Sequence, residues 1–253
     1  MRQVMHTSPH EHIAYFGDTA RVPYGGKSSE TIMRYSIENA IFLMEKNVKI
    51  LVIACNTSAA FAVDKLQQIF NIPVIGVIAP GAEKAVEVTR TGRIGILGTK
   101  GTVRSGAYQR EIHKRMPQAT VVPIACPLLV PLVEERFYDH PAAKMIIKEY
   151  LQPLRASNVD TLLLGCTHYP LLYDLIREEV GDEVTLVDPA KSCADKVREV
   201  LIQYNLQTPQ DTKPQYRYYV SDDSDKFCSL GSVFLGEEID SSAIECVNVP
   251  FGR

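Results

Sequence analysis

The chain has 253 residues, of which 45% are hydrophobic and 23% charged, the composition of an ordinary globular protein. Its formal net charge of −3 argues against a nucleic-acid-binding protein, because such proteins usually carry an excess of basic residues. No apolar run approaches the ~20 residues of a membrane span, and the first residues lack the apolar segment of a signal peptide. We therefore expect a cytoplasmic protein with neither a nucleic-acid nor a membrane partner.

Strands and helices are predicted to alternate along the chain. Runs of β-branched and aliphatic residues predict strands at 12–16, 49–54, 73–78, 93–97, 120–124, 160–165, 184–187 and 216–220. Helices are predicted between most of them, with 101–116 as a single helix, and residues 207–214 are predicted to form a polar linker. This order indicates an α/β protein with parallel sheets.

Two of the predicted strands end in similar sequences. The aliphatic run 50–54 leads into Cys55-Asn56-Thr57, and the run 161–165 leads into Cys166-Thr167-His168. An unbroken apolar run of this kind indicates a strand buried on both faces, and parallel sheets bind ligands where such strands end. The separation of the two cysteines in sequence is about one small domain. We expect two similar α/β domains, with the active site in the cleft between them.

The expected domain crossings lie in two loop-like segments. Ala79-Pro80-Gly81 follows one predicted strand and Asp188-Pro189 follows another. These crossings predict a first domain of residues 1–79 with 188–253, and a second domain of residues 80–187.

The cysteine pattern argues against a metal or disulfide protein. None of the six cysteines forms a Cys-x-x-Cys pair, so zinc and dithiol redox motifs are absent, and no cofactor or metal is expected. Cysteines in the cytosol are usually either buried hydrophobic residues or reactive thiols. We interpret four of them as buried filler, namely Cys126, Cys193, Cys228 and Cys246.

The residues around Cys55 and Cys166 suggest acid–base chemistry on an anionic substrate. A thiol at a helix start is expected to have a lowered pKa, and the backbone N–H groups there can hold an anion. His168, two residues after Cys166, could protonate or orient a reacting group. Asp18, Glu134 and Glu135 are weaker candidates, because carboxylates in loops are mostly solvated.

Two other functions fit the sequence less well. The glycine-rich stretch 92–101 matches neither the dinucleotide-binding pattern nor the P-loop pattern. A Cys–His thiol hydrolase needs one nucleophile and one base, which leaves the second cysteine unexplained. Two equivalent thiols on opposite sides of a carbon instead fit stereochemical inversion, in which one thiol removes a proton and the other returns one.

Five segments together resemble the glutamate racemase family: 16–25, 54–57, 98–103, 165–170 and 234–236. The resemblance implies a cofactor-independent enzyme that interconverts L- and D-glutamate for bacterial peptidoglycan. It implies that Cys55 and Cys166 are the two acid/base thiols, that His168 assists Cys166, and that Glu134 or Glu135 lies nearby. The implied substrate-binding residues are Tyr24, Gly25, Asn56, Thr57, Thr167 and His168. A homodimer is among the oligomeric states that remain open.

The resemblance leaves two alternatives. Related aspartate racemases usually lack histidine after the Cys-Thr pair, so His168 favours glutamate over aspartate or another amino acid. Family members also begin with a strand that ends in Asp-Ser-Gly, and this chain shows no counterpart of it, since residues 1–5 resemble the end of the helix that follows. A catalytically impaired glutamate-binding homologue is therefore the second alternative.

Overall fold

The structure, a computed structural model, describes residues 1–247. The strands are β1 (Ile13–Gly17), β2 (Leu51–Ile53), β3 (Val74–Gly76), β4 (Arg93–Gly98), β5 (Thr120–Ala125), β6 (Thr161–Gly165), β7 (Thr185–Val187), β8 (Tyr216–Val220) and β9 (Ile244–Cys246). The α-helices are α1 (Arg2–Thr7), α2 (Ser29–Met44), α3 (Asn56–Ile69), α4 (Ile78–Val88), α5 (Lys100–Ser105), α6 (Ala107–Arg115), α7 (Leu129–Glu134), α8 (Pro141–Ala156), α9 (Tyr173–Val180), α10 (Pro189–Gln203) and α11 (Ser224–Leu235). The 3-10 helices are η1 (Thr19–Arg21), η2 (Phe137–Asp139), η3 (Tyr169–Leu172) and η4 (Ser241–Ala243).

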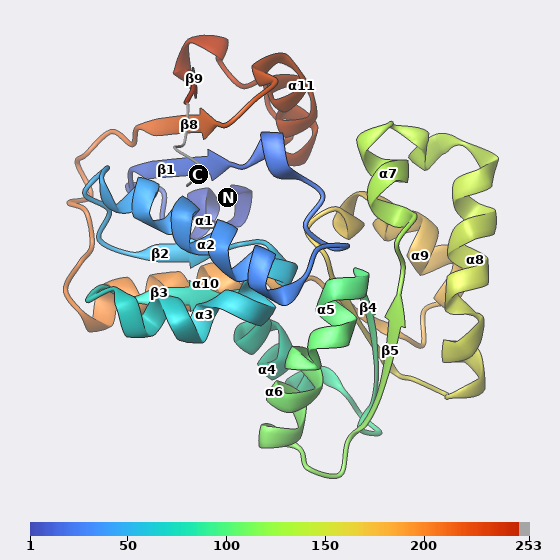
Figure 1. The fold of residues 1–253 in the computed structure, drawn as a ribbon. Helices are drawn as coiled ribbons and strands as arrows, with labels where there is room; N and C mark the ends of the chain where they lie inside the picture. Colours follow the sequence, from blue (N-terminus) through green and yellow to red (C-terminus); the bar gives the residue numbers. More distant parts are fainter. Residues whose placement is uncertain (248–253) are drawn as a thin grey trace.

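One parallel sheet organises the middle of the chain. Its four strands lie in the order β5-β4-β6-β7, and Gly98 at the end of β4 is level with Ala125 on one side and Gly165 on the other. Helices cover both faces of this sheet, with α4 and α6 on one side and α8 and α9 on the other (Figure 1). The predicted parallel α/β arrangement is confirmed here.

The second cysteine strand, β6, is buried on both faces. All five of its residues are buried, and successive side chains enter different hydrophobic clusters, as the alternation of a strand requires. Leu163 packs into the cluster of α4, α6 and α10, whereas Leu162 and Leu164 pack into the cluster of α7, α8 and α9. This burial explains the unbroken aliphatic sequence before Cys166.

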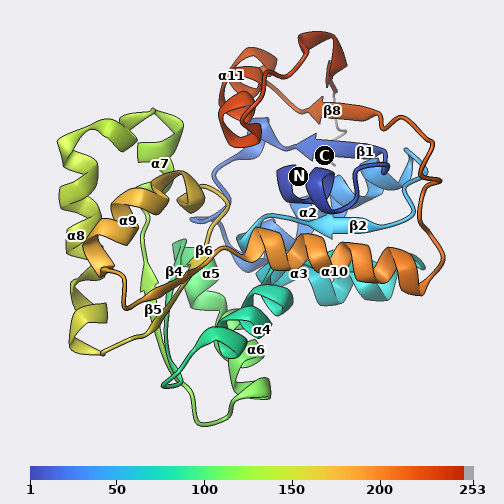
Figure 2. The ribbon, with the colours of Figure 1, turned by 180° about the vertical axis from the view of Figure 1, so that it is seen from behind.

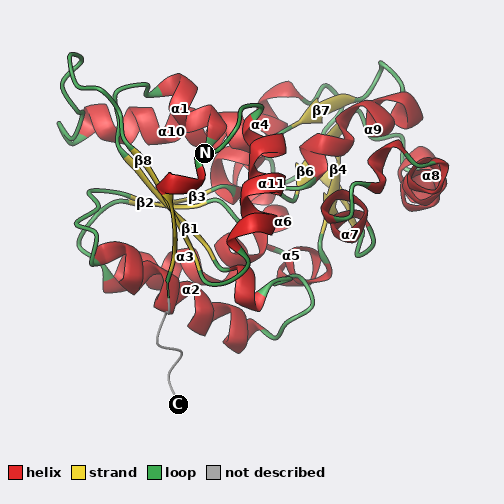
Figure 3. Ribbon diagram, turned by 90° about the horizontal axis from the view of Figure 1, so that it is seen from above, coloured by secondary structure: helices red, strands yellow, loops and turns green. Residues whose placement is uncertain are grey.

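The remaining strands form two separate parallel sheets. β1 pairs with β8, which pairs with β9, and β2 pairs with β3. Among the strands of residues 1–247, none joins β1 to β2. Helices α2 and α3 pack together on one side of these strands, and α1 and α10 pack together on the other (Figure 3).

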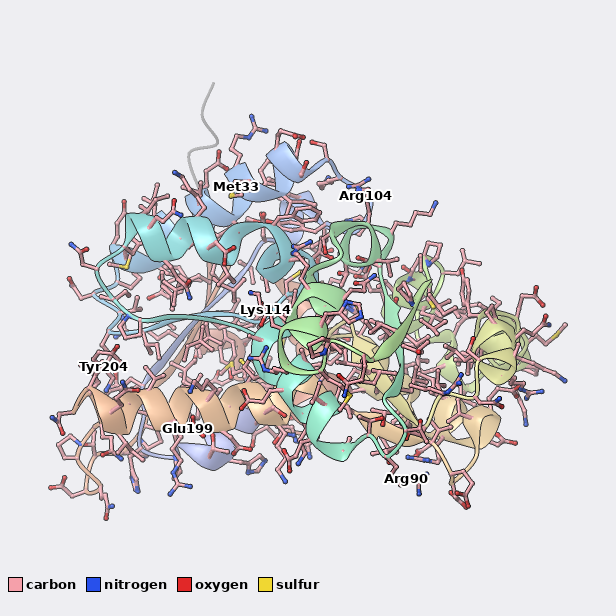
Figure 4. All side chains as sticks on the ribbon, turned by 90° about the horizontal axis from the view of Figure 1, so that it is seen from below. Met33, Arg90, Arg104, Lys114, Glu199 and Tyr204 are labelled. Carbon is pink, nitrogen blue, oxygen red and sulfur yellow. The ribbon has the colours of Figure 1, made fainter. Side chains whose placement is uncertain are left out.

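Helix α10 connects the two halves of the molecule. It begins directly after β7, with Asp188 as its N-cap, and then packs against α4, β3 and α1 (Figure 2). Glu199 lies on its outer side and Tyr204 at its end (Figure 4). The predicted domain crossings fall at this N-cap and in the first turn of α4, and the division into two domains remains a prediction.

Two local predictions differ from the structure. Residues 101–116 form two helices, because Gly106 has φ +64°, a left-handed conformation that ends α5 and that glycine adopts without strain. Strand β9 was not predicted from the sequence.

None of the helices within residues 1–247 is both long and apolar enough to cross a membrane.

A buried carboxylate connects β6 to the loop after α4. Asp160 accepts hydrogen bonds from Thr89 Oγ1 (2.6 Å) and from the backbone N–H groups of Arg90 (2.7 Å) and Thr91 (2.6 Å). Burial alone would raise the pKa of Asp160, but these hydrogen bonds outweigh it and lower the pKa to about 2. The loop therefore depends on a charged carboxylate.

Replacing Asp160 by asparagine is expected to cost about 2 kcal/mol of unfolding free energy at pH 7. A lowered pKa contributes stability above the unfolded-state value of ~3.9, and this contribution is lost as the pH falls toward 2. Urea unfolding at pH 7 and pH 3 measures the difference. The exposed Asp182 is the control, and its change to asparagine should stay within about 0.5 kcal/mol. An equal loss for Asp160→Asn at both pH values would contradict this account.

Candidate active site

The two cysteines of the repeated sequence lie at the carboxyl ends of two parallel strands. Cys55 follows β2, is the N-cap of α3 and is half-buried. Cys166 follows β6 and is 7% exposed. A charge on Cys55 affects the pKa of Cys166, so the two thiols lie within electrostatic reach of each other although they come from different sheets.

The pKa of Cys166 does not follow the sequence prediction. Burial raises it to about 12, and the hydrogen bonds from the His168 backbone and from Thr167 offset only part of this effect. The expected lowering of the pKa is wrong for this thiol because the effect of burial dominates. A 3-10 helix, η3, follows Cys166 instead of an α-helix. Without substrate, Cys166 therefore holds its proton at neutral pH.

The imidazole of His168 lies between Cys166 and a carboxylate. Its Nδ1 is 3.8 Å from the Cys166 sulfur, and its Nε2 is 3.3 Å from Glu134 Oε1. Phe234 of α11 packs edge-to-face on the ring, with the ring centres 5.4 Å apart. The hydrogen bond with His168 lowers the pKa of Glu134, so this carboxylate stays charged.

The sequence left open which of two glutamates approaches the site. The structure places Glu134 against His168, whereas the exposed Glu135 lies 3.9 Å from Lys226 Nζ. Glu134 is the last residue of α7, and α7 packs against η3, the 3-10 helix that begins directly after His168.

The start of α3 contacts the start of α5 through a ring of three hydroxyl groups. Thr57 Oγ1 lies 2.9 Å from Thr99 Oγ1 and 3.1 Å from Thr102 Oγ1, and the latter two are 3.1 Å apart. Thr99 is also the N-cap of α5, and Thr102 is buried. A second contact is made by Tyr108 of α6, whose hydroxyl donates to Asn56 Oδ1 at 2.6 Å.

Sequence reasoning missed Thr99, Thr102 and Tyr108 as site residues. They lie 42, 45 and 52 residues from their partners in α3, so no local pattern connects them. The signal available was the segment 98–103, which contributed to the family resemblance without a residue being singled out.

The loop after β1 presents its glycine to the site and its tyrosine to the interior. The buried hydroxyl of Tyr24 donates to Asp18, and burial together with this bond raises its pKa. A Cβ at Gly25 would lie 2.6 Å from Thr99 Cβ, and the Gly25 carbonyl accepts from Gly101 N at 2.8 Å. Gly25 thus contacts the ring of hydroxyl-bearing threonines. The Tyr24 hydroxyl is already bonded to Asp18, and the role of Tyr24 in substrate binding stays a prediction.

Asp18 forms a buried ion pair with Arg21. Arg21 Nε lies 2.9 and 2.8 Å from the two Asp18 oxygens, and the guanidinium also contacts Glu38 and packs 4.0 Å from the Tyr35 ring centre. In the turn that follows β8, Ser221 Oγ donates a hydrogen bond to Asp18 Oδ1 at 3.1 Å. This carboxylate is occupied in holding the loop to α2 and β8.

The remaining predicted residues are placed as follows. Thr167 is exposed, with Oγ1 3.4 Å from His168 Nδ1. Cys126 and Cys193 are buried, as the filler interpretation predicts, Cys228 is half-buried, and Cys246 is exposed, so that interpretation is wrong for Cys246. Within residues 1–247, no three or more His, Cys, Asp or Glu side chains are grouped to hold a metal ion.

The fold and the site together indicate the class of protein: it has parallel α/β sheets, with a thiol at the end of a strand in each half of the molecule. The chain belongs to the Asp/Glu/Hydantoin racemase family, whose family model matches residues 6–197. Among its relatives is the glutamate racemase of Geobacter metallireducens, 48% identical over 239 residues, which are 94% of this chain and 88% of the relative. The glutamate racemase of Neisseria meningitidis serogroup A is 48% identical over 250 residues, covering 98% of this chain and 92% of the relative.

Solved structures agree with this assignment. The glutamate racemase isoform RacE1 of Bacillus anthracis superimposes with a TM-score of 0.93 at 37% identity, over 98% of this chain and 92% of that one. The glutamate racemase of Francisella tularensis, solved in complex with D-glutamate, gives a TM-score of 0.91 at 36% identity with the same two coverages. The resemblance and the fold class predicted from the sequence are confirmed.

Proposed function

We propose that this chain is an amino-acid racemase that interconverts L-glutamate and D-glutamate without a cofactor, in the cytoplasm, and supplies D-glutamate for peptidoglycan. The observation that carries the proposal is the pair of thiols, Cys55 and Cys166, at the ends of two parallel strands and within electrostatic reach of each other. The similarity to glutamate racemases over nearly the whole chain supports glutamate as the substrate.

The carboxylates of glutamate have donors available around Cys55. The N-terminus of α3 offers backbone N–H groups, and Asn56, Thr57, Thr99 and Thr102 offer amide and hydroxyl groups beside it. Binding here holds the α-carbon between the thiols, and positioning of this kind supplies much of the barrier reduction for a weakly acidic C–H bond. On the Cys166 side the exposed Thr167 hydroxyl is the corresponding donor, and His168, beside Cys166 and Glu134, is assigned to proton transfer.

The reaction conserves protons. In one direction the Cys55 thiolate takes the α-proton, and the Cys166 thiol, which holds its proton at rest, gives one to the opposite face of the carbanion. In the reverse direction Cys166 must first be a thiolate. Its proton passes to His168 Nδ1 while Cys55 takes a proton from water, so that Cys55 is now the thiol that protonates the carbanion. The resulting imidazolium lies between the Cys166 thiolate and Glu134.

A circular-dichroism assay with each enantiomer of glutamate and of aspartate, without added cofactor, tests the proposal. The expected result is racemisation of glutamate whichever enantiomer is supplied, at a rate that a chelator does not lower. Racemisation of aspartate instead would identify another amino-acid racemase. Binding of D-glutamate by calorimetry without any change in ellipticity would identify an impaired glutamate-binding homologue.

Replacing His168 by alanine is expected to lower kcat about 10²-fold while KM changes less than about threefold, because the ring moves a proton and does not hold the substrate. Glu134→Gln should show a smaller loss of the same kind, since the imidazolium loses its charged partner. Glu135→Gln is the matched control and should leave both constants unchanged. A His168→Ala protein changed in KM alone would make His168 a binding group.

A further inference from the structure

Tyr108 lies between the two segments that carry the thiols. It belongs to α6 and is 1% exposed. Its hydroxyl donates a hydrogen bond at 2.6 Å to Oδ1 of Asn56, the residue that follows Cys55. No step of the proposed reaction uses this tyrosine. It nevertheless contacts both parts of the site, the start of α3 after Cys55 and the end of β6 before Cys166.

The ring of Tyr108 packs against the end of β6. A Cβ at Gly165, the residue before Cys166, would lie 3.2 Å from Tyr108 Cε2 and 2.7 Å from the carbonyl oxygen of Leu97. A Cβ at Gly81 of α4 would lie 3.4 Å from the Tyr108 hydroxyl. A side chain at Gly165 would therefore press on this ring, whereas at Gly81 the Tyr108 hydroxyl lies at ordinary contact distance. The ring is packed between the end of β6 and α4.

The hydrogen bond from Tyr108 determines which way the Asn56 amide points. An asparagine side chain has one acceptor oxygen and two N–H donors, and rotation by half a turn exchanges them. With Oδ1 held by Tyr108, the two donors of Nδ2 point to the other side, where no acceptor among residues 1–247 engages them. Burial raises the pKa of Tyr108 well above its ordinary value, so its hydroxyl remains a donor throughout the working pH range.

We propose that Tyr108 is a positioning residue. It orients the Asn56 amide so that both N–H groups face the substrate carboxylate, and it holds the start of α3, after Cys55, in place relative to the end of β6, before Cys166. The inference rests on the proposed function for the identity of the anion. The orientation of the amide itself is a property of the ligand-free protein.

The kinetic test compares two tyrosines that each lose one buried hydroxyl. Tyr108→Phe keeps the ring and removes the bond to Asn56, and Tyr169→Phe removes an equally buried bond, from Tyr169 to the carbonyl of Cys126 (3.0 Å). Tyr108→Phe is expected to raise KM about tenfold for both enantiomers with kcat within about twofold, because an amide free to rotate offers its acceptor half of the time and loses its fixed donors. Tyr169→Phe should leave KM unchanged.

A double-mutant cycle shows whether the effect passes through Asn56. In an Asn56→Ala background, Tyr108→Phe should add no further increase in KM, because the group it orients is gone. An unchanged KM in Tyr108→Phe, or the same fold-increase with and without Asn56, would overturn the proposal, since a merely structural tyrosine would act equally in both backgrounds.

A spectroscopic measurement separates this inference from the proposed function. The side-chain NH2 resonance of Asn56, assigned by its disappearance in Asn56→Ala, should shift in Tyr108→Phe and not in Tyr169→Phe. This shift is expected even if the unsubstituted protein does not racemise glutamate, in which case the function fails and the orienting role stands. A resonance that is unchanged in Tyr108→Phe would refute the orienting role, whatever the substrate.

Discussion

Replacing either Cys55 or Cys166 by serine is expected to reduce racemisation by at least about 10³-fold, because a serine hydroxyl is a far weaker acid and base than a thiol and cannot complete the exchange of protons. The remaining thiol can still remove the α-proton of one enantiomer. Each single variant should therefore exchange that proton with deuterated solvent for one enantiomer only, and the two variants should differ in which one.

The measurement is circular dichroism for racemisation, with proton NMR in D2O for exchange. Cys228→Ser is the matched control, since Cys228 is half-buried like Cys55 and its sulfur donates a hydrogen bond to the carbonyl of Ile239, away from the candidate site. The two enantiomers have equal free energy, so kcat/KM must fall equally in both directions for every variant. Near-normal racemisation in both single variants would disprove the two-thiol mechanism.

Replacing Arg21 by alanine is expected to cost about 3–5 kcal/mol of unfolding free energy, because it leaves the buried carboxylate of Asp18 without its cation. The loss should extend to catalysis. The loop between Asp18 and Gly25 carries the glycine that contacts Thr99. Without Arg21 this loop loses its ionic contact with α2 and keeps the hydrogen bond from Asn39 to the Tyr24 hydroxyl.

Urea unfolding measures the stability, and the racemisation assay measures the second effect. Arg21→Lys keeps the charge but loses the planar pair of contacts with Asp18, so it should recover part of the stability. Arg34→Ala is the control, because Arg34 is exposed and 3.9 Å from Glu38, and its loss should stay within about 0.5 kcal/mol. A loss below about 1 kcal/mol for Arg21→Ala would mean that the ion pair contributes little.

The buried strands were the features best predicted from the sequence, because their burial leaves continuous apolar runs along the chain. All eight predicted strands are present, because aliphatic runs such as that of β6 are too short for a typical helix and are bounded by polar residues. The break at Gly106 was missed because the apolar spacing continues through it, and one positive φ decides the outcome. Strand β9 has only three residues, and its pairing with β8 depends on long-range contacts.

The candidate site was predictable only in part. The repeated cysteine sequence identified Cys55 and Cys166, but nothing local shows that burial raises the pKa of Cys166 or that Tyr24 turns its hydroxyl toward Asp18. These properties arise where segments distant in sequence meet. The choice between Glu134 and Glu135 is of the same kind, since it depends on where α7 ends relative to β6.

The ring formed by Thr57, Thr99 and Thr102 has a consequence for how tightly the site can hold an anion. Three hydroxyls have three protons, and a closed ring uses each of them once. In the empty protein the threonines thus solvate one another, and an arriving carboxylate gains each hydroxyl bond by breaking one that already exists. On the proposed function, the net gain from these hydroxyls is small, so glutamate bound there would leave readily whichever its hand.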